Sequence, residues 1–268
     1  MDPARRGEFE KIALEVRKDV VRMLSVAHSG GFKKVIGIVD ILVYLYWDCM
    51  NVFPAERNRQ DRDRFVLGKG VAAPALYACL ARRGYFSREE LWSYGRLGAT
   101  LQGFADIRTP GVDAPWCHGG AIGIARGIAS SFGDEGRQRV FCLVDEDDMT
   151  CGAAWESVVS LPSEGAERLV LLIDSTTQSE KTASGLEIFG WDVVRADGGD
   201  FDSISEAFGA PDRGVACPRA IIVLNKAANM TDMGFQEGDA PMSKDDVDNA
   251  INLLESGTRG GGGPDGGK

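Results

Sequence analysis

The chain has 268 residues and a formal net charge of −10, with 44% hydrophobic residues and 26% charged residues. This length and apolar content are enough for one large domain with a well-buried core. The acidic balance argues against binding to nucleic acid or to an anionic membrane, because both require basic surfaces. The six cysteines include no CxxC pair, which indicates reduced thiols in a cytoplasmic protein.

The first half of the chain is predicted to be mainly helical. Apolar residues recur at helical spacing through 9–27, and the apolar run 35–50 predicts a second, buried helix. A short strand is expected at 64–67, followed by a helix. After the turn-rich segment 96–117, a helix of small residues is expected to begin near His118. The charged start shows no signal peptide, and no apolar run is long enough to cross a membrane.

From residue 139 onward, predicted strands alternate with predicted helices. The apolar runs assigned as strands are 139–145, 168–175, 191–197 and 219–227. Short apolar strands joined by helices form parallel sheets that are buried on both faces. We therefore predict an α/β fold, a three-layer, doubly wound, mainly parallel sheet with helices on both faces. We expect one domain over residues 1–256 and a flexible glycine-rich tail over 257–268.

Several segments carry a family resemblance. They are "DRDRFVLGKGVAAPALYACLA", "LQGFADIRTPGV", "GAAWESV" and "EIFGWDVVRADGGD". Together they closely resemble the transketolase family across nearly the whole chain, over its thiamine diphosphate-binding (PP-type) half. The resemblance implies the N-terminal subunit of a split transketolase, with ketol transfer or related carbon–carbon chemistry as its activity. It also implies a complementary subunit carrying the pyrimidine and C-terminal domains, in a heterotetramer or another dimer-based assembly.

The resemblance implies thiamine diphosphate and Mg²⁺ as cofactors, but the family's ligands are replaced. The glycines of the family's GDG loop fall on Asp145 and Asp147, and its metal-binding aspartate falls on Glu146. The second metal ligand falls on Thr176, and the carbonyl ligand falls on Gln178. The cofactor-binding positions implied by the resemblance are Glu146, Asp148, Gly152 and Gly120. Family histidines likewise fall on other residues, such as Val71 and Phe104.

These replacements make the acidic loop a poor partner for a diphosphate. Each added like-charge contact at about 4 Å costs roughly 4 kcal/mol at an effective dielectric near 20, and two would offset most of a micromolar binding free energy of about 8 kcal/mol. A solvated acidic turn and an oxygen-only Mg²⁺ or Ca²⁺ site built from Glu146, Asp148 and Thr176 both stay open. The lysines that could turn inward to offset the acids are Lys33, Lys34, Lys69, Lys181 and Lys226.

Two residues are candidates for catalysis. His118 lies beside the altered family segment Gly119–Ala121, and Lys33 replaces a small residue near the expected cofactor mouth, where it could bind a sugar phosphate or form a Schiff base. Cys151 occupies the position of a family acid, but no histidine is expected beside it to activate the thiol. Three functions remain open: a diverged enzyme subunit, a non-catalytic partner of an active subunit, and a scaffold reused for cofactor-independent chemistry.

Overall fold

Five parallel strands form one sheet in the order β1-β2-β3-β5-β4. The computed structural model describes residues 1–28, 32–133, 136–160, 166–177, 180–209, 217–225 and 243–257. The strands are β1 (Arg64–Leu67), β2 (Val140–Asp145), β3 (Leu169–Ser175), β4 (Asp192–Asp197) and β5 (Arg219–Leu224). Every strand predicted from an apolar run is present, and the α/β class is confirmed.

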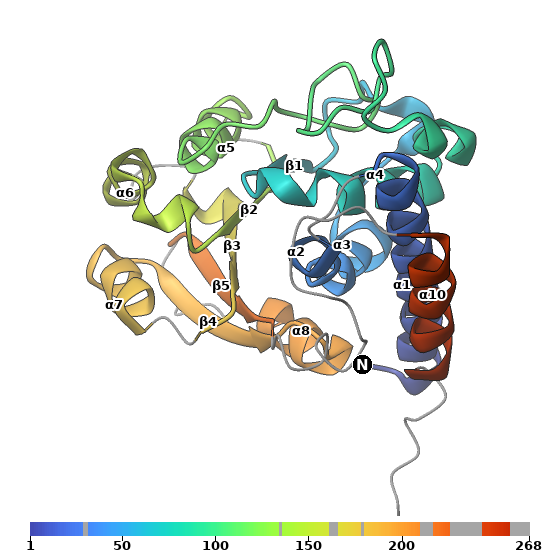
Figure 1. The fold of residues 1–268 in the computed structure, drawn as a ribbon. Helices are drawn as coiled ribbons and strands as arrows, with labels where there is room; N and C mark the ends of the chain where they lie inside the picture. The colour runs from blue at the N-terminus through green and yellow to red at the C-terminus, as the bar shows by residue number, and fades with distance from the viewer. Residues whose placement is uncertain are drawn as a thin grey trace, which may run out of the picture.

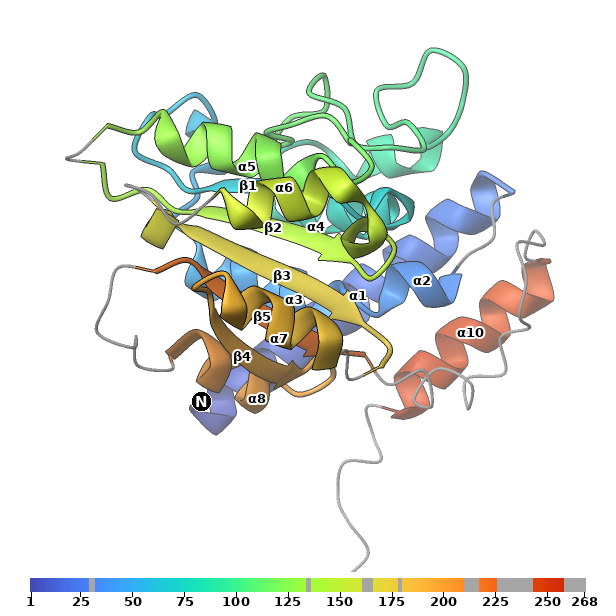
Figure 2. The ribbon, with the colours of Figure 1, turned by 90° about the vertical axis from the view of Figure 1, so that its left-hand side faces the viewer.

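Helices cover both faces of this sheet, which confirms the three-layer architecture (Figures 1 and 2). One face carries α1 (Pro3–Val26), α3 (Val39–Tyr44), α4 (Ala73–Arg83) and α8 (Phe201–Gly209). The other carries α5 (Ala121–Ser130), α6 (Gly152–Val159) and α7 (Glu180–Ile188). The last described helix, α10 (Lys244–Gly257), packs on α1. No described helix is both long and apolar enough to span a membrane.

The single helix predicted over residues 35–50 is wrong. The chain forms α2 (Phe32–Ile36), a turn at residues 37–38, α3, and then a π-helical turn over Leu45–Cys49. Gly37 lies in the break, and glycine costs a helix interior about 1 kcal/mol relative to alanine. The remaining short helical turns are Pro54–Glu56, Gly70–Ala72, Arg88–Ser93, Asp148–Thr150 and Ala166–Arg168.

The core lies on both sides of the central strands because their side chains alternate between the two helical layers. In β2, Phe141 and Leu143 pack with the layer that contains α1, whereas Cys142 and Val144 pack with the layer that contains α5. Burial of this kind on both faces explains the continuous apolar runs. The predicted tail lies outside the described residues, except for Gly257, the last residue of α10.

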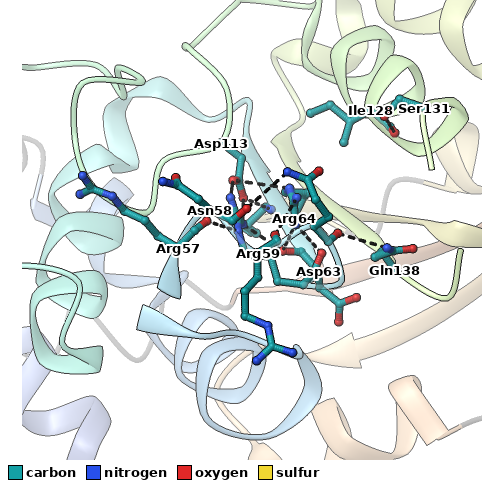
Figure 3. Close-up of polar contacts among 12 residues, drawn as sticks. Arg57, Asn58, Arg59, Asp63, Arg64, Asp113, Ile128, Ser131 and Gln138 are labelled. Carbon is teal, nitrogen blue, oxygen red and sulfur yellow. Dashed lines mark hydrogen bonds and ion pairs between the residues drawn. The ribbon is translucent and has the colours of Figure 1, made fainter. Parts of the chain in front are cut away.

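The family-like "DRDRF" segment lies at the amino end of β1, where it forms a polar network (Figure 3). The buried carboxylate of Asp63 accepts the N–H of Asn51 at 2.9 Å and the N–H of Arg139 at 2.7 Å. Asp113 pairs with Arg62 and accepts the N–H of Phe65 at 2.9 Å. The network thus ties β1 to the start of β2 and to the loop around residue 113.

Candidate functional site

The candidate site lies at the opposite edge of the sheet, where the strands end. Gly68–Gly70 follow β1, Asp145–Asp148 end and follow β2, and Asn225 follows β5. Because β2 and β3 are neighbours in register, Asp145 is paired with Asp174. This is the edge at which α/β proteins commonly bind ligands. The acidic loop is therefore located where the sequence predicts it.

The acidic loop is ordered by its own hydrogen bonds, so the alternative of a solvated turn does not hold for its last member, Asp148. Asp148 is buried, Asp145 and Glu146 are partly buried, and Asp147 is exposed. The Asp148 N–H donates to Asp145 Oδ1 at 3.0 Å, and Asp148 Oδ1 accepts the Gly119 N–H at 2.8 Å. Burial, together with the nearby charge of Asp148, raises the pKa of Asp145. Through these hydrogen bonds, Asp148 links the segment before α5 to the end of β2.

The carboxylate of Glu146 lies at the end of β3, where hydroxyl groups donate hydrogen bonds to it. Its Oε1 accepts the hydroxyls of Ser175 at 2.5 Å and Thr177 at 2.8 Å, and Thr176 Oγ1 lies 3.4 Å from its Oε2. Burial alone would raise the pKa of Glu146, but the bonds from these three residues lower it. The structure therefore brings together two of the predicted metal positions, Glu146 and Thr176.

The donors in this region do not fit the family's Mg²⁺–diphosphate group. Both oxygens of Glu146 already accept hydroxyl groups, and no cluster of three or more His, Cys, Asp or Glu side chains in the described ranges is arranged to hold a metal ion. Gln178, the third predicted metal position, lies outside the described residues. Gly120 precedes α5, and Gly152 is exposed at the start of α6. Neither glycine brings a positive charge to the loop.

One predicted inward-turning lysine is present, but its charge is already paired. Lys69 is buried and forms an ion pair with Asp174. The side-chain amide of Asn225 donates to the same carboxylate. Sequence reasoning missed Asn225, although a polar residue directly after a predicted strand was a signal for this edge. Lys34 and Lys181 are exposed, and the side chain of Lys33 and all of Lys226 lie outside the described part of the chain.

The expectation that no histidine lies beside Cys151 is wrong. His118 Nε2 is 3.3 Å from Cys151 Sγ, and His118 Nδ1 is 3.3 Å from Asp148 Oδ1. The loop before α5 supplies the histidine, and the turn between β2 and α6 supplies the acid and the thiol. Their separation of about thirty residues in sequence hides this arrangement from any local motif.

An aromatic pair, also missed from the sequence, covers the loop after β1. Trp116 Nε1 donates to the Gly68 carbonyl at 2.7 Å, and its ring stacks on that of Phe104 with centroids 4.2 Å apart. A Cβ atom at Gly70 would lie 2.4 Å from Trp116 Nε1. Glycine is therefore required where the tryptophan crosses. The Trp116 and His118 ring centroids are 6.3 Å apart, which places Trp116 beside the imidazole.

Comparison with known proteins gives matches over most of the chain. Residues 10–250 match the family described as transketolase, thiamine diphosphate binding domain. Transketolase-like protein 2 of Bos taurus is 28% identical, covering 92% of this chain and 42% of that protein. The chain thus spans less than half of this relative. The structure of transketolase from Campylobacter jejuni has a TM-score of 0.80 at 20% identity, over 92% of this chain and 42% of that one.

Other relatives are named as single subunits and are matched over most of their length. One of the subunits of the apulose-4-phosphate transketolase of Phocaeicola vulgatus is 27% identical, over 72% of this chain and 73% of that relative. The 6-deoxy-6-sulfo-D-fructose transketolase subunit SqwG of a Clostridium species is 29% identical, over 80% of this chain and 85% of that relative.

Proposed function

Since this chain belongs to the transketolase family, as its thiamine diphosphate binding domain, we propose that it is the N-terminal subunit of a two-chain transketolase-like assembly. The observation that carries the proposal is the pattern of coverage. The chain matches 73% and 85% of two relatives named as subunits, but only 42% of transketolase-like protein 2. In this proposal, a complementary chain supplies the pyrimidine and C-terminal domains.

Exposed apolar side chains next to the site support a partner surface. Leu97, Phe104 and Ile107 lie in the long connection before α5, and Val71 lies just after β1; all four are exposed. The same connection reaches the end of β1 through Trp116. Exposed apolar side chains are typical of protein-binding surfaces where they gather into a patch. The partner would then cover the edge of the sheet that carries the acidic loop.

Within this assembly, we propose that the altered edge does not hold the cofactor through the family's positions. Glu146 is engaged by three neighbouring hydroxyls, and Lys69 is paired with Asp174. In an active complex, the partner would therefore provide most contacts to the diphosphate. The same contacts favour a second candidate, in which this chain is a non-catalytic partner that stabilises or regulates an active subunit.

Co-purification with a complementary pyrimidine-domain chain tests the assembly. We expect a stable complex by size-exclusion chromatography with light scattering. Phe104→Asp combined with Ile107→Asp should disrupt it, because two charges would be buried in the interface. Ile188→Asp, at a more exposed apolar position at the end of α7, is the control. Failure of the wild-type chains to associate would refute the proposal.

Calorimetric titration of the complex with thiamine diphosphate and Mg²⁺, alongside a ketol-transfer assay, separates the two candidates. A diverged enzyme subunit gives binding heat and turnover, whereas a non-catalytic partner gives neither above the level of the complementary chain alone. Glu146→Gln should leave both readouts unchanged if the family's metal position is no longer used. A large loss in this variant would show that Glu146 still serves the cofactor.

A further inference from the structure

Three side chains from two segments form an acid–imidazole–thiol series: His118 comes from the loop before α5, and Asp148 and Cys151 come from the turn between β2 and α6. Asp148 Oδ1 lies 3.3 Å from His118 Nδ1, and His118 Nε2 lies 3.3 Å from Cys151 Sγ. Each imidazole nitrogen therefore faces one partner. With the imidazole as base, this arrangement can activate a cysteine nucleophile, and the carboxylate lies within ion-pair distance of the imidazole. Cys151 Sγ also lies 3.8 Å from the Asp147 carbonyl oxygen.

The surrounding backbone fixes this series in place. Asp148 is buried and also accepts the Gly119 N–H at 2.8 Å, so the residue after His118 is held by the same carboxylate. Gly119 has φ of +67°, and a Cβ there would lie 2.5 Å from the Cβ of Cys151. The glycine thus permits the close approach that brings the imidazole onto the thiol.

The thiol lies where a helix begins and beside an imidazole. Cys151 is the N-cap residue of α6, and its Sγ lies 3.3 Å from His118 Nε2. The side chain of Cys151 is partly exposed, so a small reagent can reach the thiol. Cys142, in contrast, is buried in β2, and burial raises the pKa of its thiol. The two cysteines therefore have opposite environments.

We propose that Cys151, His118 and Asp148 form a nucleophilic thiol site that adds reversibly to small uncharged aldehydes. The thiol proton moves to His118 Nε2 as the Cys151 Sγ–carbon bond forms and the carbonyl π bond breaks. The carbonyl oxygen then takes that proton from Nε2 to give a thiohemiacetal. The addition needs no oxidant or reductant, and it does not depend on the proposed partner subunit.

Charge and shape select the class of aldehyde. The acids of the loop, Asp145–Asp148, are next to the thiol in sequence and repel phosphorylated or carboxylated compounds. On the other side, the Trp116 ring lies 6.3 Å from the imidazole and stacks on Phe104. The site therefore offers an aromatic wall without a free cation among the residues described around it, which suits a neutral electrophile.

Alkylation by iodoacetamide, followed by peptide mass spectrometry, tests the nucleophile in the full chain. Cys117 is more exposed than Cys151 and is the internal reference. At neutral pH we expect Cys151 to react at least about tenfold faster than Cys117, because His118 Nε2 is placed to take the proton of its thiol. His118→Asn should remove this advantage, whereas His28→Asn, at the chain's other histidine, should preserve it. His118 is exposed, so the variant should fold, and circular dichroism checks that it does.

Two further measurements test the ligand class. Glycolaldehyde should slow the alkylation of Cys151 but not that of Cys117. The ratio of the alkylation rate of Cys151 to that of Cys117 should be smaller with anionic iodoacetate than with neutral iodoacetamide. The nucleophile is refuted if Cys151 reacts no faster than Cys117, or if folded His118→Asn reacts as the wild type does. Absence of protection by the aldehyde, or an equal preference for the two reagents, would overturn the assigned ligand class.

Discussion

The two edges of the sheet satisfy their buried charges in different ways. At the amino edge, Asp63 and Asp113 receive backbone N–H groups and arginine side chains, within a segment that still resembles the family. At the carboxyl edge, Asp148 and Glu146 receive backbone N–H groups and hydroxyls instead. The contrast shows that the ligand-binding edge can lose its family residues while the fold persists, provided that each buried acid keeps a donor.

The largest loss in the free energy of unfolding is expected for Lys69→Met, because this variant breaks the buried ion pair of Lys69 with Asp174 at the carboxyl edge. Lys69→Met leaves Asp174 with the amide of Asn225 but without its cation. Breaking a buried pair from one side costs about 3 kcal/mol or more in the free energy of unfolding. Urea denaturation measures this loss.

A double variant and a surface control complete that experiment. Lys69→Met with Asp174→Asn should recover at least half of the lost stability, because no unpaired charge remains buried. Lys181→Met removes an exposed lysine and should change stability by less than about 0.5 kcal/mol. A negligible effect of Lys69→Met would mean that the carboxyl edge is uncoupled from the fold.

The next largest effect is expected at the amino edge. Asp63→Ala leaves the N–H groups of Asn51 and Arg139 without their acceptor. Two unsatisfied, partly buried donors should lower the free energy of unfolding by about 2 kcal/mol. Asp61→Ala, in the same motif, removes only an exposed pair with Arg59, which is worth about 0.5 kcal/mol or less. Equal effects of the two variants would contradict the role assigned to the network.

The sequence predicted the sheet well because its strands are buried on both faces. The runs around β2 and β3 are continuous in apolar residues, and short continuous apolar runs of this kind are typical of parallel strands that are buried on both faces. The run 35–50 is apolar except for Gly37, Asp40 and Asp48, and it gives no periodicity that separates one helix from several. Only the glycine at position 37 marked the break, and a single glycine is a weak signal.

The candidate site was predictable in position but not in its contacts. The end of each strand follows from the fold, which is why Glu146 and Thr176 were expected near each other. The buried carboxylate of Asp148 accepts the Gly119 N–H, and His118, the residue before Gly119, contacts Cys151. Both contacts depend on the turn before α5. Such contacts join residues about thirty positions apart, and their geometry is set by loop conformation rather than by residue spacing.

Glu146→Gln tests how weakly the altered edge depends on its acids. The variant loses the charge that accepts hydroxyls from Ser175 and Thr177, so we expect a loss of about 1 kcal/mol at neutral pH. Because folding lowers the pKa of Glu146, its contribution is present above the ordinary value of 4.5 and disappears as the pH falls through the lowered value. Glu156→Gln, on the exposed face of α6, should show no such dependence.

Asp145→Asn should give the smallest effect, and it should have the opposite sign. Burial raises the pKa of Asp145, so the ionised carboxylate destabilises the folded state at pH values above the raised pKa. Asparagine keeps an oxygen for the Asp148 N–H and removes the charge, which should slightly raise the thermal midpoint at neutral pH. The stability gain of Asp145→Asn should vanish as the pH falls below the ordinary pKa of 3.8, because the aspartate of the wild type is then neutral, as the asparagine of the variant is. Asp147→Asn, at the exposed neighbour, should give no comparable gain. A loss of stability in Asp145→Asn would mean that the loop needs this charge, and the edge would then still be built around a cation.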